Sequence, residues 1–193
     1  MSRILIDVDG VVADFVDALL LKIRATLGRE FTREQVTCFD IREALGLDRC
    51  EWLVVRDCIE AQGYCSKFMP YAGAIESVGR LAERHEVFFA TTPWRESVTW
   101  VHDRDRWLER WFGKKLGRRV VHTQYKRLLE ADILVDDKTE NCLEWLGERK
   151  EGAVALLFDR PWNASDVLPA EQSVIRVRTW DDVERWVEQG GES

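Results

Sequence analysis

The sequence lacks the features that mark membrane proteins and zinc-thiolate proteins. Its 193 residues contain no apolar run that approaches the roughly 20 residues needed to span a bilayer. No basic segment followed by a long apolar stretch and a cleavage site stands near its first residue, so we expect a cytoplasmic protein without a membrane partner. Five cysteines without a C-x-x-C pair, and only three histidines, argue against zinc and favour reduced structural thiols.

Positive charge is also scarce, which limits the class of partner. The chain has 28 Lys and Arg against 35 Asp and Glu, a formal net charge of -7 at pH 7. A nucleic acid polymer usually requires a broad basic surface, so we exclude that partner. One basic stretch carries aromatic residues at helical spacing, and we interpret it as a solvated helix face with a buried aromatic stripe. Its basic residues are Arg104, Arg106, Arg110, Lys114, Lys115, Arg118 and Arg119.

Short apolar segments alternate with helical patterns along most of the chain. A hydrophobic content of 46% in 193 residues suffices for one domain with a sizeable core. The alternation predicts an α/β fold with a parallel sheet. We expect strands at Ile4–Val8, Val87–Thr91, Val120–Thr123, Ile133–Val135, Val154–Phe158 and Val174–Val177. We expect helices at Ala74–Arg84, Glu96–Trp111, Thr139–Leu146 and Thr179–Val187.

A long helical segment interrupts this alternation after the first strand. It shows no convincing strand and predicts helices at Val16–Leu27, Asp40–Leu45 and Arg49–Ala61. We therefore divide the chain into an α/β core, residues 1–14 and 70–193, and a helical cap, residues 15–69. Ligands of open α/β sheets bind beyond the carboxyl ends of the strands, so such a cap can cover the site as a lid.

The most informative segment, Asp7-Val8-Asp9-Gly10, places two carboxylates one residue apart at the end of the first strand. In extended backbone, residues i and i+2 face the same side, so Asp7 and Asp9 can converge on one point. Gly10 permits a sharp turn and brings backbone N–H groups near an anion. An ordinary solvated turn uses the same residue types. An EF-hand calcium loop fits poorly, because it requires Gly at the sixth position and an acidic residue at the twelfth.

Polar residues also follow the next three expected strands. Thr91 and Thr92 end the second strand, where hydroxyl and N–H groups could hold a phosphate, although a helix-capping turn looks the same. Lys126 follows the third strand and would by itself be an ordinary surface lysine. Asp136 and Asp137 follow the fourth, and two adjacent carboxylates at a buried strand end favour a hard cation such as Mg²⁺.

Together these strand ends resemble the haloacid dehalogenase superfamily of phosphohydrolases, and more narrowly its 5′(3′)-deoxyribonucleotidase family. The resemblance covers about residues 3–145. It implies a Rossmann-like three-layer sandwich with a parallel central sheet and a small helical cap inserted after the first strand. The matching segments are Asp7-Val8-Asp9-Gly10-Val11-Val12-Ala13-Asp14-Phe15, Ala90-Thr91-Thr92-Pro93, Trp107-Leu108-Glu109-Arg110-Trp111-Phe112-Gly113 and Ala131-Asp132-Ile133-Leu134-Val135-Asp136-Asp137.

The resemblance implies a role for each matched polar residue. Asp7 would attack phosphorus and become a transient aspartyl phosphate, which water then hydrolyses. Asp9 would protonate the leaving sugar oxygen and later take a proton from the water. Thr91 and the N–H of Thr92 would bind phosphate oxygens, and Lys126 would neutralise charge on the nucleophile and the phosphate.

The resemblance also implies a metal site and a recognition surface. Mg²⁺ would be held by Asp7, the Asp9 carbonyl and Asp137, whereas Asp136 would orient Lys126 or a metal-bound water. Three residues are expected to contact the substrate. Phe15 stands at the position where the family has a recognition residue. Trp94 replaces an aliphatic residue of the family and Lys138 replaces its arginine, so both departures affect substrate recognition. Three further aromatics of the cap, Trp52, Tyr64 and Phe68, could stack on a base but are more often core at this spacing.

The expected function is a Mg²⁺-dependent phosphomonoesterase acting on nucleoside monophosphates, deoxy pyrimidine ones by resemblance. Another small phosphate ester is the first alternative. A non-catalytic phosphate- or phosphoprotein-binding regulator is the second, and Asp9 argues against it because binding needs no general acid. A receiver-type signalling domain carries its acidic pair first, unlike this chain. A phosphomutase would keep the same residues, and the sequence leaves open whether the chain is a monomer or a homodimer.

Overall fold

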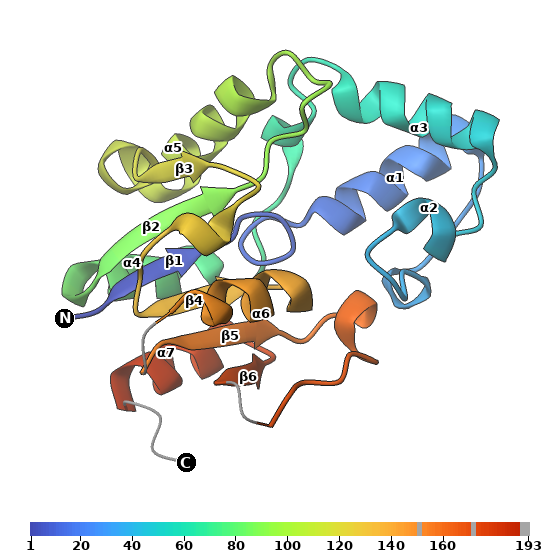
Figure 1. Ribbon diagram of the computed structural model, residues 1–193. Coiled ribbons are helices and arrows are strands. Elements are labelled where there is room, and N and C mark those ends of the chain that lie inside the picture. Colours follow the sequence, from blue (N-terminus) through green and yellow to red (C-terminus); the bar gives the residue numbers. More distant parts are fainter. Residues whose placement is uncertain (150–151, 171–172, 190–193) are drawn as a thin grey trace.

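A computed structural model describes residues 1–149, 152–170 and 173–189 of the chain (Figure 1). Six strands form one sheet in the order β3-β2-β1-β4-β5-β6, and each paired strand runs parallel to its neighbour. The prediction of an α/β fold with a parallel sheet is therefore confirmed. The strands are β1 (Arg3–Ile6), β2 (Glu86–Thr91), β3 (Val120–His122), β4 (Ile133–Asp136), β5 (Val154–Phe158) and β6 (Val174–Val177).

Helices cover both faces of the sheet, which explains why the central strands are apolar on both sides. Ile4 and Ile6 of β1 join the larger core cluster, on the side of the helices α4, α5 and α7. Leu5 joins the smaller cluster on the opposite side, with Trp145 of the helix α6. The result is a three-layer sandwich. The helices are α4 (Ala74–Arg84), α5 (Trp100–Gly117), α6 (Thr139–Gly147) and α7 (Trp180–Gln189).

The segment between β1 and α4 is helical, as predicted, and forms the upper right part of Figure 1. Asp14 caps its first helix by accepting a hydrogen bond from the N–H of Asp17. The described residues of this segment form no strand, and its three α-helices start and end within one residue of the predicted bounds. The division into core and cap at residues 14 and 70 stays a prediction. The segment contains α1 (Phe15–Leu27), η1 (Arg33–Gln35), α2 (Ile41–Ala44), α3 (Arg49–Glu60) and η2 (Cys65–Lys67).

The two ends of this helical segment lie side by side against the core. Asp14 N donates to Met69 O at 2.8 Å, and Tyr71 N donates to Val12 O at 2.9 Å. Near the second end of the segment, the indole Nε1 of Trp107 in α5 donates a hydrogen bond to the carbonyl of Phe68 at 2.8 Å. The segment is therefore positioned by its own two connections and by α5.

Most predicted elements agree with the structure to within two residues, and two differences in bounds affect the region of the strand ends. β1 ends at Ile6, so the turn begins at Asp7 rather than after Val8. The helix expected at Glu96–Trp111 is α5, which starts at Trp100 because the preceding residues form turns, with Ser97 N bonded to Trp94 O. α5 also runs beyond Trp111, although Gly113, with a φ of 74°, interrupts its helical geometry.

Three smaller observations complete the fold. All five cysteines are free thiols. Thr179 caps α7, since the N–H of Asp182 donates to its hydroxyl at 3.1 Å. None of the helices in the described ranges is long and apolar enough to cross a bilayer.

Candidate active site

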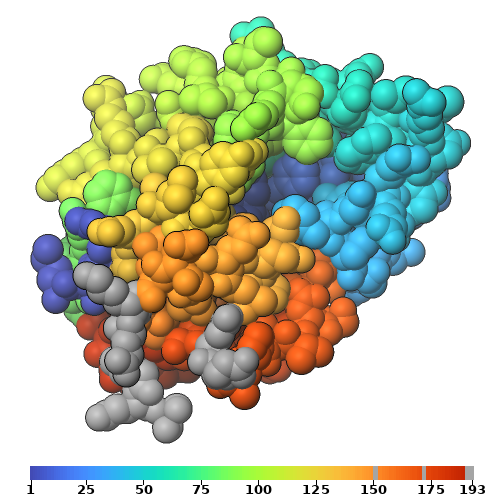
Figure 2. All heavy atoms as spheres, in the orientation of Figure 1, coloured from blue at the N-terminus to red at the C-terminus, as the bar shows by residue number. Residues whose placement is uncertain are grey.

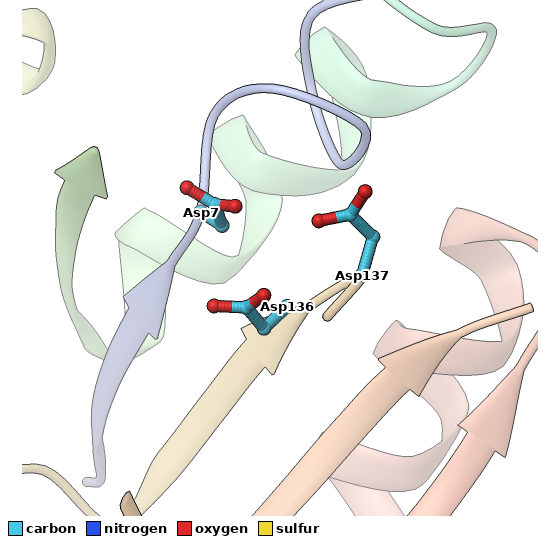
Figure 3. Close-up of side chains that lie close together, drawn as sticks. All are labelled: Asp7, Asp136 and Asp137. Atoms are coloured by element: carbon cyan, nitrogen blue, oxygen red, sulfur yellow. The ribbon is translucent and has the colours of Figure 1, made fainter. Parts of the chain in front are cut away.

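The polar residues that follow β1, β2, β3 and β4 meet at one edge of the sheet, because the carboxyl ends of parallel strands lie together. Asp7, Asp136 and Asp137 each place one carboxylate oxygen within 4.8 Å of the other two. Figure 3 shows the three carboxylates facing the same small space at the ends of β1 and β4. Thr91 is the last residue of β2, and Lys126 begins the short helix η3 (Lys126–Leu128) after β3.

The three carboxylates are buried and repel one another. The exposed fractions of the three residues are 7% for Asp7, 0% for Asp136 and 4% for Asp137. Burial raises the pKa of Asp7 to about 7, with Asp136 adding to the rise and Lys126 opposing it. Burial also raises the pKa of Asp137 well above its usual range, reinforced by the charges of Asp7 and Asp136. Three hard oxygen donors in need of a counter-charge suit a divalent ion such as Mg²⁺.

Lys126 supplies one positive charge to this cluster. Its ammonium lies 2.7 Å from Oδ1 of Asp7 and 2.6 Å from Oδ2 of Asp136. Burial lowers the pKa of Lys126, but the charges of Asp136 and Asp7 outweigh burial and raise that pKa overall. Lys126 is therefore protonated at neutral pH. The partners of the Asp7 carboxylate in the described residues all contact Oδ1, so Oδ2 is left without a hydrogen bond.

Asp136 and Asp137 differ in what their carboxylates contact. Asp136 accepts hydrogen bonds from Lys126, from the N–H of Lys138 at 2.9 Å and from the Asn141 amide at 3.2 Å. Asp137 accepts one side-chain hydrogen bond among the described residues, from the indole of Trp162 at 2.9 Å. Asp136 is thus placed to orient Lys126, and Asp137 keeps an oxygen for a metal ion.

Gly10 is required by the position of Asp137. Its φ is +78°, in the left-handed region that favours glycine. A Cβ atom at this position would lie 1.9 Å from Oδ2 of Asp137. The turn after β1 therefore passes directly under the Asp137 carboxylate, and any side chain would displace it.

The carboxylates of Asp9 and Asp7 have different hydrogen-bond partners. Both of its carboxylate oxygens accept hydrogen bonds from Nη2 of Arg104, at 2.6 and 2.8 Å. The Arg104 side chain is fully buried, whereas 28% of the Asp9 side chain is exposed. The sequence argument that Asp7 and Asp9 converge on one point is therefore incomplete, because the strand ends at Ile6 and the turn directs Asp9 toward α5.

The prediction that the basic stretch forms a solvated face is wrong for Arg104. Its guanidinium carbon lies 5.4 to 5.7 Å from the ring centres of Phe68, Trp100 and Trp107. Cation–π attraction and the Asp9 carboxylate together compensate its burial. One signal was present in the sequence, since Arg104 follows Trp100 by four residues and precedes Trp107 by three and so lies on the aromatic stripe. The exposed members of the stretch are Arg106, Arg110, Lys114, Lys115 and Arg118.

The two threonines after β2 have different surroundings. Thr91 is fully buried, and its hydroxyl has no hydrogen-bond partner among the described residues. Eleven other buried side-chain atoms of the described residues also have no partner, but the Thr91 hydroxyl stands at the strand end beside Asp7 and Lys126. Thr92 is exposed, and its hydroxyl donates to the carbonyl of Thr123 at 3.2 Å. Thr91 is thus the stronger candidate for contacting a phosphate oxygen through its side chain.

A cavity of about 590 Å³ opens above these residues. Figure 2 shows it as a hollow whose floor is the dark blue N-terminal segment, between the green and yellow, cyan and light blue, and orange parts of the chain. Its floor includes Asp7, Asp9, Gly10, Lys126 and Asp137. The wall on the side of the helical segment is mostly apolar, which suits the organic part of a small ligand.

The expected recognition residues Phe15, Trp94 and Lys138 all line the cavity. Of the three remaining aromatics, Trp52 also lines it, whereas Tyr64 and Phe68 do not and are packed in the core. Tyr64 and Phe68 meet edge to face, with ring centres 5.2 Å apart. Sequence reasoning missed several lining residues, because no local pattern shows which residues of a loop or a helix end face a cavity. These include Cys38, Phe39, Asp40, Gln124, Asn141 in α6 and Trp162.

Comparison with known proteins agrees with this geometry. The sequence model of the family described as "5′ nucleotidase, deoxy (Pyrimidine), cytosolic type C protein" matches residues 1–189. The chain belongs to this family. Human cytosolic-type 5′(3′)-deoxyribonucleotidase is 32% identical over 143 residues, which cover 70% of each chain. The human mitochondrial 5′(3′)-deoxyribonucleotidase is 29% identical over 143 residues, 72% of this chain and 63% of its own length.

Solved structures show that this deoxyribonucleotidase-family chain has the haloacid dehalogenase fold. A haloacid dehalogenase family hydrolase from Deinococcus radiodurans, with bound phosphate and sodium, superposes with a TM-score of 0.65 at 12% identity. That match covers 98% of this chain and 96% of the other. A haloacid dehalogenase-like hydrolase from Streptococcus pneumoniae gives a TM-score of 0.63 at 12% identity, with 97% and 98% covered. The fold and family predicted from the strand ends are confirmed.

Proposed function

We propose that the chain is a Mg²⁺-dependent phosphomonoesterase that hydrolyses nucleoside monophosphates to nucleoside and phosphate. The observation that carries this proposal is the Asp7 carboxylate, buried at the floor of the cavity, 2.7 Å from the Lys126 ammonium and beside Asp137. Membership of the deoxyribonucleotidase family supports the same reaction class.

The reaction uses two carboxylates in two successive displacements. A free oxygen of Asp7 attacks phosphorus, so that an aspartyl O–P bond forms as the bond between phosphorus and the sugar oxygen breaks. Asp9 gives its proton to the departing oxygen. Water then attacks the phosphorus and breaks the aspartyl O–P bond, while Asp9 takes a proton from the water. The products are the nucleoside, inorganic phosphate and the original enzyme.

The surrounding residues bind and neutralise the phosphate. Lys126 offsets the repulsion between the Asp7 carboxylate and the anionic substrate, and the unpartnered Thr91 hydroxyl donates to a phosphate oxygen. The backbone N–H of Thr92 is assigned to a second phosphate oxygen. Asp7, Asp137 and the Asp9 carbonyl would hold Mg²⁺, which supplies electrostatic stabilisation of the charge that develops on the phosphoryl group.

The aromatic wall of the cavity supports a nucleoside rather than a bare phosphate. Phe15, Trp52 and Trp94 line it from three different parts of the chain. Flat apolar rings suit stacking on a nucleobase. Lys138, also in the lining, lies 4.2 Å from the ring centre of Phe39 and closes the polar side of the cavity. We assign Phe15, Trp94 and Lys138 to substrate recognition.

A phosphate-release assay tests the reaction and the substrate together. Purified protein with Mg²⁺ is expected to release phosphate from deoxyribonucleoside monophosphates more rapidly than from sugar phosphates, and to lose this activity in EDTA. Asp7→Asn should lower the rate by roughly 1000-fold or more because the nucleophile is removed. Asp57→Asn, at an exposed position of α3, is the matched control and should retain full activity.

The outcomes separate the alternatives. Activity retained in Asp7→Asn would disprove the nucleophile assignment. Release from sugar phosphates but not from nucleotides would favour another small phosphate ester. No release from any compound of the panel would favour a regulatory phosphate-binding protein.

A further inference from the structure

Trp162 contacts the candidate metal site although the reaction assigned above gives it no role. It lies in the short helix η4 (Pro161–Asn163), which begins three residues after the end of β5, and is 7% exposed. Its indole Nε1 donates to Oδ2 of Asp137 at 2.9 Å. The ring also lines the cavity. An aromatic side chain with a single N–H donor is therefore aimed at a carboxylate that would bind Mg²⁺.

The same turn also holds the backbone of Asp137 in place. The amide Nδ2 of Asn163 donates to the backbone carbonyl of Asp137 at 2.7 Å and to that of Phe158 at 2.7 Å. Oδ2 of Asp137 is confined further, because the α-carbon of Gly10 lies against it so closely that no Cβ would fit. The backbone and one carboxylate oxygen are thus held, and no described residue donates a hydrogen bond to the other oxygen, Oδ1.

This arrangement limits how Asp137 can bind a cation. A carboxylate whose Oδ2 is occupied by an indole N–H and pressed on a glycine presents mainly Oδ1 to the ion. Mg²⁺ takes six ligands in a strict octahedron and accepts single carboxylate oxygens, whereas Ca²⁺ takes six to eight and often binds both oxygens of one carboxylate. A residue that holds the carboxylate in the one-oxygen mode favours the smaller ion.

We propose that Trp162 is a positioning residue that holds Asp137 as a one-oxygen ligand and thereby selects Mg²⁺ over Ca²⁺. This inference rests on the proposed function only in requiring a divalent cation at Asp7 and Asp137. Trp162 acts through Asp137, because its single N–H donates to that carboxylate.

Direct metal titration of the folded protein tests the proposal. Trp162→Phe keeps a large aromatic ring and removes the N–H donor. Calorimetric titration in the absence of substrate should show Mg²⁺ affinity reduced by about 10-fold, the low end of the effect of a residue that orients a metal ligand. Ca²⁺ affinity should fall less or rise, so that the ratio of the two dissociation constants moves toward Ca²⁺.

Trp145→Phe is a matched control. Trp145 is fully buried, and its indole donates at 2.9 Å to a backbone carbonyl, that of Leu129, rather than to a carboxylate. It should lose similar packing and hydrogen-bond energy without a change in either metal affinity. Wild-type Mg²⁺ and Ca²⁺ affinities in Trp162→Phe would overturn the role of Trp162 and leave the phosphatase proposal intact. Absence of Mg²⁺ binding in the wild type would overturn both the metal site and this inference.

A second measurement does not depend on the folding of a variant. In wild-type protein labelled with ¹⁵N in tryptophan, the indole N–H signal of Trp162 should shift when Mg²⁺ is added, because its acceptor becomes a metal ligand. The signal of Trp145 should stay in place. An unshifted Trp162 signal at saturating Mg²⁺ would contradict the proposal.

Discussion

Asp7 and Asp9 are two residues apart in sequence and serve different partners. Asp7 is paired with Lys126 and faces the acidic pair, whereas Asp9 receives both of its side-chain hydrogen bonds from Arg104. The first environment suits a nucleophile held near a cation and a lysine. The second holds the acid–base group in a fixed direction at the cavity floor. A buried arginine that contacts the proposed proton donor therefore contributes to the site, although it is not among the residues that line the cavity.

Replacing Arg104 should affect turnover more than stability. In Arg104→Met, Asp9 loses the partner that fixes its direction, and misplacement of a catalytic group by about 1 Å can cost roughly 100-fold in rate. The stability cost should stay below about 2 kcal/mol, because Asp9 is partly hydrated and two N–H groups of Arg104, Nε and Nη1, have no partner among the described residues. Steady-state kinetics and urea unfolding measure the two effects.

Arg110→Met is the control on the same helix. Arg110 is exposed and lies over the ring of Trp111, so its loss should leave kcat unchanged. A variant Arg104→Met with wild-type kcat would show that the contact with Asp9 is structural only.

At the scale of the elements, the strands β1 to β5 and the turns that follow them each contribute at least one chemical group. β1 provides Asp7, β2 provides Thr91, and β4 provides the acidic pair, while the turns after β3 and β5 provide Lys126 and Trp162. Their meeting requires the turn after β1 to pass close beneath Asp137. Gly10 makes that approach possible, and its positive φ is the geometry of the turn itself.

Gly10→Ala should cost stability and metal affinity together. The new methyl group would meet the Asp137 carboxylate at 1.9 Å and push this proposed metal ligand aside. Gly28→Ala is a close control, because Gly28 has a similar φ of +67° but no atom within 4 Å of the added carbon. Alanine at a left-handed position should cost about 1 kcal/mol in Gly28→Ala, and Gly10→Ala should cost more. Urea unfolding and Mg²⁺ titration compare them, and equal effects of both variants would contradict the close contact.

At the scale of the whole molecule, the fold stabilises a cluster of buried carboxylates that is unfavourable without a cation. Asp7, Asp136 and Asp137 are almost completely buried on one side of the sheet edge, and Lys126 balances only part of their charge. Burial and mutual repulsion raise the pKa of Asp7 and of Asp137. The stability of the metal-free protein must therefore depend on pH.

The metal-free protein should become less stable as the pH rises toward 7. Because the pKa of Asp7 is about 7 in the folded state and about 4 in an unfolded chain, the folded protein keeps a proton that the unfolded chain has lost. The free energy of unfolding then falls with increasing pH between these values. Mg²⁺ should restore stability most at the upper end of this range, where it binds the ionised form without displacing a proton.

Urea unfolding in EDTA and in Mg²⁺ across this pH range measures the effect. Asp7→Asn carries no titrating group at this position and should show a shallower pH dependence in EDTA than the wild type. A wild-type curve in EDTA that parallels that of Asp7→Asn would contradict the raised pKa.

The sequence by itself determined the strands, the helical segment after β1 and the groups at the strand ends. These follow from local patterns, since apolar runs, helical periodicity and the order of Asp7, Thr91, Lys126 and Asp136-Asp137 are all readable along the chain. The parallel alternation also implied that these groups would share one edge of the sheet. Family membership followed from the same residues.

The tertiary structure decided which distant side chains complete the site. Arg104 and Asp9 are 95 positions apart, and Trp162 and Asp137 are 25 apart. No local pattern couples such pairs, because their contact depends on how α5 packs against the turn after β1 and how β5 lies beside β4 in the sheet. For the same reason, the packing separated Trp52, in the cavity wall, from Tyr64 and Phe68, in the core.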